Sequence, residues 1–179
     1  MLKRAKLKNI ASDERGLAAI EFALIAPVAI LLYCGFAELT MAMMAERRAA
    51  HTASVVADLV SQTPTITAAQ MTDVWTVGNS IMSPFSPTTL ALRVTSVTAD
   101  NLGVPRVTWS QGNGMGALTG GAAVSGFPPT LLAAGDSVIM ADVQYAYTSP
   151  LQMVLPSVLT FRDTFYLKPR RSASVTLLP

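Results

Sequence analysis

The sequence that decides the fold is Gly16-Leu17-Ala18-Ala19-Ile20-Glu21-Phe22, together with the apolar residues that follow it. Between residues 17 and 44 the only charged side chains are Glu21 and Glu38. As an α-helix, this segment would be about 42 Å long. The hydrocarbon core of a bilayer is only about 30 Å thick. The segment 17–44 is therefore predicted to be a transmembrane helix.

A basic leader precedes this helix. Residues 1–16 contain five basic and two acidic side chains, and only Arg47 and Arg48 follow the apolar run closely. The positive-inside rule then predicts a cytoplasmic N-terminus, with the rest of the chain beyond about residue 45 on the outer side. A secretory signal has its small-residue cleavage site after the apolar run. Here Gly16 lies before it, so a cut between Gly16 and Leu17 would leave the helix on the mature protein.

The two acids of the apolar run have different predicted roles. A carboxylate within a membrane span is costly, which makes Glu21 a candidate functional residue. It lies within about 6 Å, along the helix axis, of the amine that a cut would create on Leu17. Burial favours pairing of such charges, either within one chain or with the amine of a neighbouring subunit. Glu38 lies about 25 Å farther along the helix, near the opposite interface. It is predicted to be an interfacial acid that reaches headgroups or water by snorkelling.

Pro27 lies within this helix and removes one backbone hydrogen bond, so a local kink or loosening is predicted there. Two interpretations remain open. Prolines are common in membrane helices. Alternatively, Pro27 is a weak point where the helix adapts when it moves from lipid into a packed fibre.

Beyond the membrane, residues 45–63 form an amphipathic continuation of the helix, because apolar side chains recur at three- and four-residue steps. Residues 64–179 are predicted to form an α+β head. A capping box at Thr67 and Gln70 begins a second short helix that ends near residue 82. Alternating patterns then predict strands over 90–97, 105–110, 137–148 and 161–168. The predicted fold is a long transmembrane helix that continues into a stalk, followed by a helix-backed antiparallel sheet of about four strands. Within the head, an exposed loop is predicted at 111–129 and a break or short helix at 150–156.

The sequence offers little for catalysis or ligand binding. It contains one cysteine, Cys34, and one histidine, His51. His51 falls on the polar stripe of the stalk helix, so a surface histidine is predicted rather than a catalytic base. A glycine-rich stretch at 112–116 lacks the lysine and the context of a phosphate loop. From residue 17 onward there are 8 basic and 9 acidic side chains, which disfavours nucleic acid as a partner. We expect no enzyme activity, no cofactor and no metal site.

The N-terminal third resembles the TadE-like pseudopilins of tight-adherence (Flp) pilus systems. The resemblance rests on residues 15–27, on Gly35-Phe36-Ala37-Glu38 and on Arg47-Arg48-Ala49. It implies processing by a prepilin peptidase between Gly16 and Leu17, although Leu17 occupies a position where a small residue is expected. It further implies residence in the bacterial inner membrane and a part in pilus assembly or secretion, with Glu21 and Phe22 in the processing and assembly motif. Other pilins, pilus-assembly membrane proteins and the lipid bilayer are the implied partners.

Three hypotheses follow from these observations. The first is a non-enzymatic minor pilin or pseudopilin that is trimmed after Gly16 and packs laterally through its N-terminal helix, with a periplasmic head. The second is an inner-membrane-anchored periplasmic binding module that never enters a pilus, for which Glu21 is incidental. The third, an envelope enzyme, ranks last because the head contains no histidine. The subclass among TadE-, TadF- and TadG-like relatives stays open.

Overall fold

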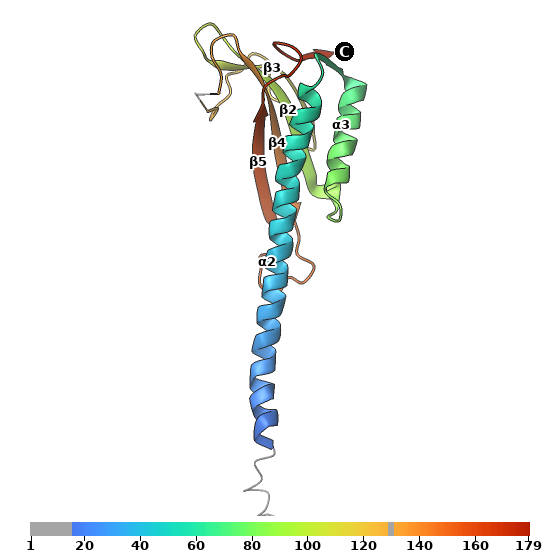
Figure 1. Cartoon of the computed structure of the whole chain (residues 1–179), viewed down its shortest axis with the longest axis vertical. Helices are drawn as coiled ribbons and strands as arrows, with labels where there is room; N and C mark the ends of the chain where they lie inside the picture. Colours follow the sequence, from blue (N-terminus) through green and yellow to red (C-terminus); the bar gives the residue numbers. More distant parts are fainter. Residues whose placement is uncertain (1–15, 129–130) are drawn as a thin grey trace, which may run out of the picture.

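The computed structural model describes residues 16–128 and 131–179, and it has the form of a rod with a head at one end (Figure 1). The rod is helix α2, Leu17–Ser61, of 45 residues. The remaining elements gather around its C-terminal half. They are β1 (Thr65–Thr67), α3 (Ala68–Ile81), the 3-10 helix η2 (Pro87–Thr89), β2 (Leu90–Ala99), β3 (Pro105–Asn113), β4 (Ser137–Tyr147), β5 (Leu159–Leu167) and β6 (Thr176–Leu178). The predicted α+β fold is confirmed.

Helix α2 is continuous through the predicted membrane span and the predicted amphipathic extension, and it runs through Pro27 without interruption. A loosening of the helix at Pro27 stays a prediction. The first half of α2 is apolar on all sides and exposed, whereas buried positions begin at Glu38 and recur to Ser61. The change follows the sequence, because an apolar stripe with a polar opposite face appears only in the second half.

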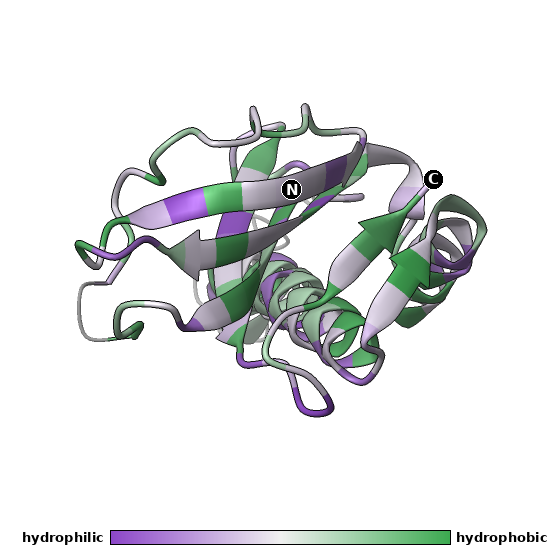
Figure 2. Cartoon of the chain, turned by 90° about the horizontal axis from the view of Figure 1, so that it is seen from above, coloured by the Kyte–Doolittle hydropathy of each residue, from purple (hydrophilic) through white to green (hydrophobic). Residues whose placement is uncertain are grey.

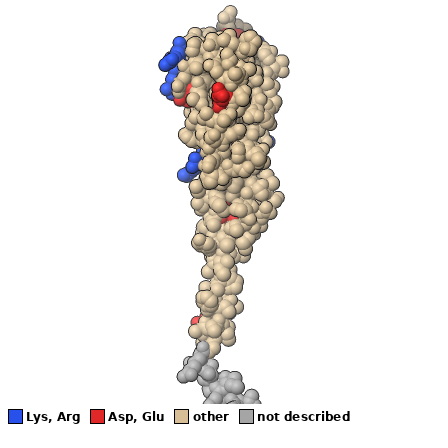
Figure 3. Space-filling view, turned by 90° about the vertical axis from the view of Figure 1, so that its right-hand side faces the viewer, with Lys and Arg blue, Asp and Glu red and all other residues tan. Residues whose placement is uncertain are grey.

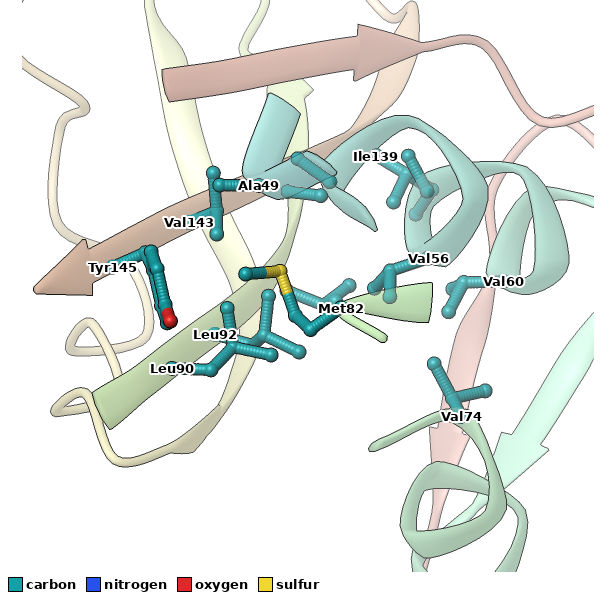
Figure 4. Close-up of a cluster of buried hydrophobic side chains, with 14 of the residues drawn as sticks. Ala49, Val56, Val60, Val74, Met82, Leu90, Leu92, Ile139, Val143 and Tyr145 are labelled. Carbon is teal, nitrogen blue, oxygen red and sulfur yellow. The ribbon is translucent and has the colours of Figure 1, made fainter. Parts of the chain in front are cut away.

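Small side chains allow α2 to lie close to the sheet. Ala45, Ala49, Ala53 and Ala57 recur at every fourth position, and all four are buried against the head. Helix α3 is equally close, since a Cβ added to its Gly78 would lie 2.8 Å from a methyl carbon of Leu92 in β2. The larger side chains of the core, among them Met82 and Leu92, fill the space between the two helices and the sheet (Figure 4). Ala53 is fully buried in this packing.

Replacing Ala53 with leucine should therefore lower the free energy of unfolding by about 1–3 kcal/mol, because the added methylenes must displace well-packed neighbours. Urea unfolding of the detergent-solubilised full chain, followed by the fluorescence of the two tryptophans, measures this change. Ala69→Leu is the matched control, since Ala69 is exposed on α3. Equal midpoints for the two variants would show that the stripe is not tightly packed.

The main sheet has four antiparallel strands, as the alternating patterns predict. The structure adds their order, β3-β2-β4-β5. In the view along the long axis (Figure 2), the sheet curves over α2, and α3 lies beside α2. Ile139, Ala141, Val143 and Tyr145 of β4 point toward the helices and belong to the main core. The intervening residues Val138 and Met140 belong to a smaller cluster on the opposite face.

The region 111–129, predicted to be an exposed loop, differs from the prediction in two ways. Strand β3 extends to Asn113, and the following loop covers the opposite face of the sheet. Its side chains Leu118, Val124 and Phe127 pack on the smaller cluster, and the rings of Phe127 and Tyr166 lie 5.1 Å apart. The physical reason is that the apolar residues on this face of β2 and β4 need cover from water. Glycine-rich sequence alone does not reveal that cover.

The turn between β2 and β3 forms at Asp100. The Asp100 carboxylate accepts hydrogen bonds from the amides of Leu102 and Val104, both at 2.9 Å, and from Arg106 at 2.8 Å. The Val104 amide and the Arg106 guanidinium hold the pKa of this carboxyl below its ordinary value. The carboxylate thus fixes the turn at the end of the head farthest from the exposed half of α2.

A second, two-stranded sheet was not predicted. Strands β1 and β6 pair in parallel, and each has only three residues, which is too short for a recognisable alternating pattern. The C-terminal segment reaches this sheet along the end of α2, where Arg170 pairs with Asp58 at 2.7 Å. The indole nitrogen of Trp109 donates to the Val175 carbonyl at 2.7 Å and secures the same segment. The end of the chain therefore closes the core around α2.

Candidate functional site: the exposed half of the long helix

The exposed half of α2 has an apolar surface on every side. Phe22, Leu24 and Ile25 are 72%, 71% and 65% exposed, and their large apolar neighbours up to Phe36 are similarly open to the surroundings. On the face shown in Figure 3, the lower part of the molecule carries almost no charge. By length and composition this helix could cross a membrane, with a mean hydropathy of 2.3 in its most apolar window. A contiguous apolar surface of this kind indicates contact with lipid or with other proteins.

Gly16 is the N-cap of α2, and Leu17 is the first helical residue. The backbone of Gly16 has φ −82° and ψ −16°, which any residue can adopt. A Cβ added there would meet no atom within 4 Å. The fold of the described residues therefore does not require a glycine at position 16, and the rest of the predicted leader lies outside the described residues.

Glu21 and Phe22 lie in the second turn of α2, and both are exposed. They are far from the head, at the free end of the rod. The structure does not bring Glu21 near Glu38, since about 25 Å of helix separates them. Glu21 is thus placed where only lipid, a neighbouring subunit or the N-terminal region of its own chain can reach it.

Glu38 differs from its prediction. Its side chain does not extend to water, because it is fully buried beneath the segment between β4 and β5. The carboxylate accepts hydrogen bonds from the Ser149 hydroxyl at 2.9 Å and from the amides of Met153, Val154 and Leu155 at 2.8, 2.9 and 3.0 Å. The expectation of a snorkelling side chain is therefore wrong. The physical reason is that four donors brought by the tertiary fold satisfy the carboxylate better than a strained reach toward water.

The segment that holds Glu38 is named here the 149–158 loop. Of the two possibilities predicted for 150–156, a break or a short helix, the structure has the break, because the backbone between β4 and β5 is irregular. The Ser149 hydroxyl also accepts from the Leu151 amide at 3.3 Å, and Gln152 has a positive φ of 51°. These features turn three successive amides toward one carboxylate. Gly35 allows the close approach, since a Cβ there would lie 3.3 Å from a methyl carbon of Val154.

Sequence reasoning missed this loop because its partners are far apart along the chain. Glu38 and Ser149 are separated by 111 positions, and their link forms only when β4 and α2 pack together. The one available signal for this contact was the presence of an acid, Glu38, in the apolar run. The local sequence does not show which hydrogen-bond donors Glu38 meets.

The other residues considered in the sequence form no second site. His51 is exposed on α2, and Cys34 is a free, half-buried thiol on the same helix. Within residues 16–128 and 131–179, no group of three or more His, Cys, Asp or Glu side chains could hold a metal ion. The candidate site is accordingly a surface, the exposed half of α2 with its acid.

Residues 16–58 match the family model described as TadE-like protein. The chain is TadE-like in this segment. The match includes Gly16, Glu21, Pro27 and Glu38, and it ends within α2, so the head sheet lies outside the matched residues. No curated protein and no solved structure shows a significant match.

The family match confirms the resemblance seen in the N-terminal third of the sequence, and it suggests a protein associated with Tad pili. The match and the apolar α2 together indicate a protein anchored in a membrane.

Proposed function

We propose that this TadE-like protein is a non-enzymatic minor pilin or pseudopilin that takes part in assembling a tight-adherence pilus. The observation that carries the proposal is the exposed half of α2, an all-round apolar helix with a single acid near its free end. A helix that served only as an anchor would need no acid there, because a carboxylate in a membrane is costly.

Processing after Gly16 is the first step of the proposed function. A prepilin peptidase would cut between Gly16 and Leu17 and create a new amine at the start of α2. The structure is compatible with this role because nothing in the fold requires glycine at position 16. The residue is then free to serve recognition by the peptidase.

Lateral packing is the second step. The apolar surface that faces lipid in the unassembled protein is suited to facing the helices of other pilins after assembly. The Glu21 carboxylate would pair with the Leu17 amine of its own chain or of a neighbour. Apolar surroundings strengthen such a charge pair. The pairing would therefore set the register between subunits. The N-terminus would be cytoplasmic and the head periplasmic, where its surface would select partner pilins and assembly proteins.

Mass spectrometry of the protein isolated from its native membrane tests the processing step. The mature chain should begin at Leu17. A Gly16→Leu variant should accumulate with its leader intact and with an unchanged head, because a side chain at position 16 has open space around it. Gly116→Leu is the control, since Gly116 also has open space but lies in the head.

A wild-type protein that keeps its leader in the membrane would contradict the proposal. That result would favour the second hypothesis, a permanently anchored periplasmic binding module.

A further inference from the structure

We propose that the 149–158 loop, held to α2 by Glu38, is a second membrane-inserted element whose apolar side chains enter the lipid leaflet nearest the head. This inference rests on the membrane-spanning part of the proposed function, and it does not depend on processing or assembly. Its occupant is the bilayer itself, beside the helix that spans it.

The position of the loop along α2 places it at membrane depth. A hydrocarbon core of about 30 Å that begins at Leu17, directly after the basic leader, ends near residue 37 of a straight helix. Any tilt of the helix carries Glu38 deeper. The loop descends from Glu38 and contacts Gly35 through Val154, and together with Leu31 it lines one apolar groove of about 260 Å³. Leu31 lies about 10 Å below Glu38 along the axis.

The composition of the loop suits lipid. From Thr148 to Thr160 the sequence has no charged residue. Four of its large apolar side chains point outward rather than into the core. They are Leu151, Met153, Val154 and Val158, exposed by 43%, 56%, 54% and 51%. In water such a cluster would be unfavourable, whereas at the membrane boundary its burial is favourable.

Glu38 removes the main obstacle to inserting an irregular loop. Backbone amides without partners are costly in lipid, so non-helical backbone is tolerated there only where it is satisfied by protein. The amides of Met153, Val154 and Leu155 all donate to the buried Glu38 carboxylate. The acid, in turn, obtains four donors at a depth where water is scarce. Each partner therefore makes the other acceptable in the membrane.

The distribution of charge favours lipid over a protein partner. The first charged residues above Glu38 on α2 are Glu46, Arg47 and Arg48, which begin about 12 Å farther along the axis and are exposed. The segment of α2 between Glu38 and Glu46 thus carries no charge, which suits a position at the boundary between hydrocarbon and headgroups. A second copy of this chain, bound over the loop, is the alternative that the experiment excludes.

The experiment places an environment-sensitive fluorophore on the loop of the full-length protein. Cys34→Ala removes the native thiol, and Val154→Cys supplies the labelling site. The protein is reconstituted at low density into phosphatidylcholine–phosphatidylglycerol vesicles. Quenching by aqueous iodide is compared with quenching by lipids that carry a spin label near the headgroup. Leu24→Cys, within the span, and Leu102→Cys, 89% exposed in the turn far from the span, are the reference positions.

The label at position 154 should behave like the label at position 24. Lipid quenching should be several-fold stronger than at position 102, and iodide quenching several-fold weaker. Adding Glu38→Gln should make position 154 several-fold more accessible to iodide without changing position 24, because two of the four donors lose their acceptor.

Three results would overturn the proposal. Strong iodide quenching at position 154 would place the loop in water. Protection from both quenchers would mean that protein, such as a second copy, covers the loop. In either case, lipid quenching at position 24 would leave the proposed function intact. If position 24 also escapes lipid quenching, the span is not in the bilayer, and both proposals fail.

Discussion

The Glu38→Gln variant should lose the attachment of the 149–158 loop to α2 while the rest of the head stays folded. The two oxygens of the carboxylate accept four hydrogen bonds, three of them from backbone amides. Glutamine offers only one accepting oxygen, and its NH₂ group would face donors. Hydrogen bonds to charged groups are among the strongest in proteins, so their loss should open the loop.

Hydrogen–deuterium exchange of the full chain in detergent or vesicles measures this effect. The amides of Met153, Val154 and Leu155 should exchange about tenfold faster or more in the variant. The β4 amides should change little, because the sheet does not depend on Glu38 for its hydrogen bonds.

Glu46→Gln is the matched control, an exposed acid two turns farther along the same helix. It should leave the loop amides unchanged. Equal exchange in wild type and Glu38→Gln would show that the loop is held by its apolar contacts alone, with no contribution from the carboxylate.

Replacing Glu21 with alanine should abolish or strongly reduce pilus assembly and leave the fold of the protein unchanged. Glu21 lies on the exposed half of α2, so its removal disturbs no part of the core. Under the proposed function it removes the partner of the Leu17 amine, and an unpaired ammonium in an apolar interface is strongly unfavourable. Cells that produce the variant should form few or no pili.

Two measurements on the same cells separate this effect from its alternatives. Immunoblotting of membranes should show normal amounts of correctly processed protein, and electron microscopy with antibody against the head should show the loss of fibres. Glu46→Ala is the control and should assemble normally. Normal pili in the Glu21→Ala strain would remove the role proposed for this acid.

The two acids show how far sequence reasoning reaches. Both were recognised because a carboxylate in an apolar run is unusual. For Glu21 the local sequence is enough to propose a role. Its proposed partner is the Leu17 amine, which lies at the start of the same helix, in its own chain or in a neighbouring subunit. For Glu38 the local sequence predicted a side chain that snorkels to headgroups or water, and the structure instead shows it buried beneath residues more than 100 positions away.

The elements of the head divide in the same manner. Helix α3 was predictable because Thr67 and Gln70 form the capping box that their spacing indicates. Strand β4 was predictable because its residues alternate between two faces that are both used. Strands β1 and β6 were not, because three residues carry no period. The cover that loop residues Leu118 and Phe127 give the sheet was also missed, since it depends on which strands become neighbours.

By itself, then, the sequence determined the long helix, its apolar and amphipathic halves, and the α+β class of the head. Hydrophobic periodicity and capping act over a few residues, so they can be read along the chain. Only the tertiary structure decided that the 149–158 loop closes over Glu38 beside Gly35. That contact arises because the packing of β4 and β5 on α2 delivers the loop to the helix, and no local pattern encodes which distant backbone amides a buried carboxylate will meet.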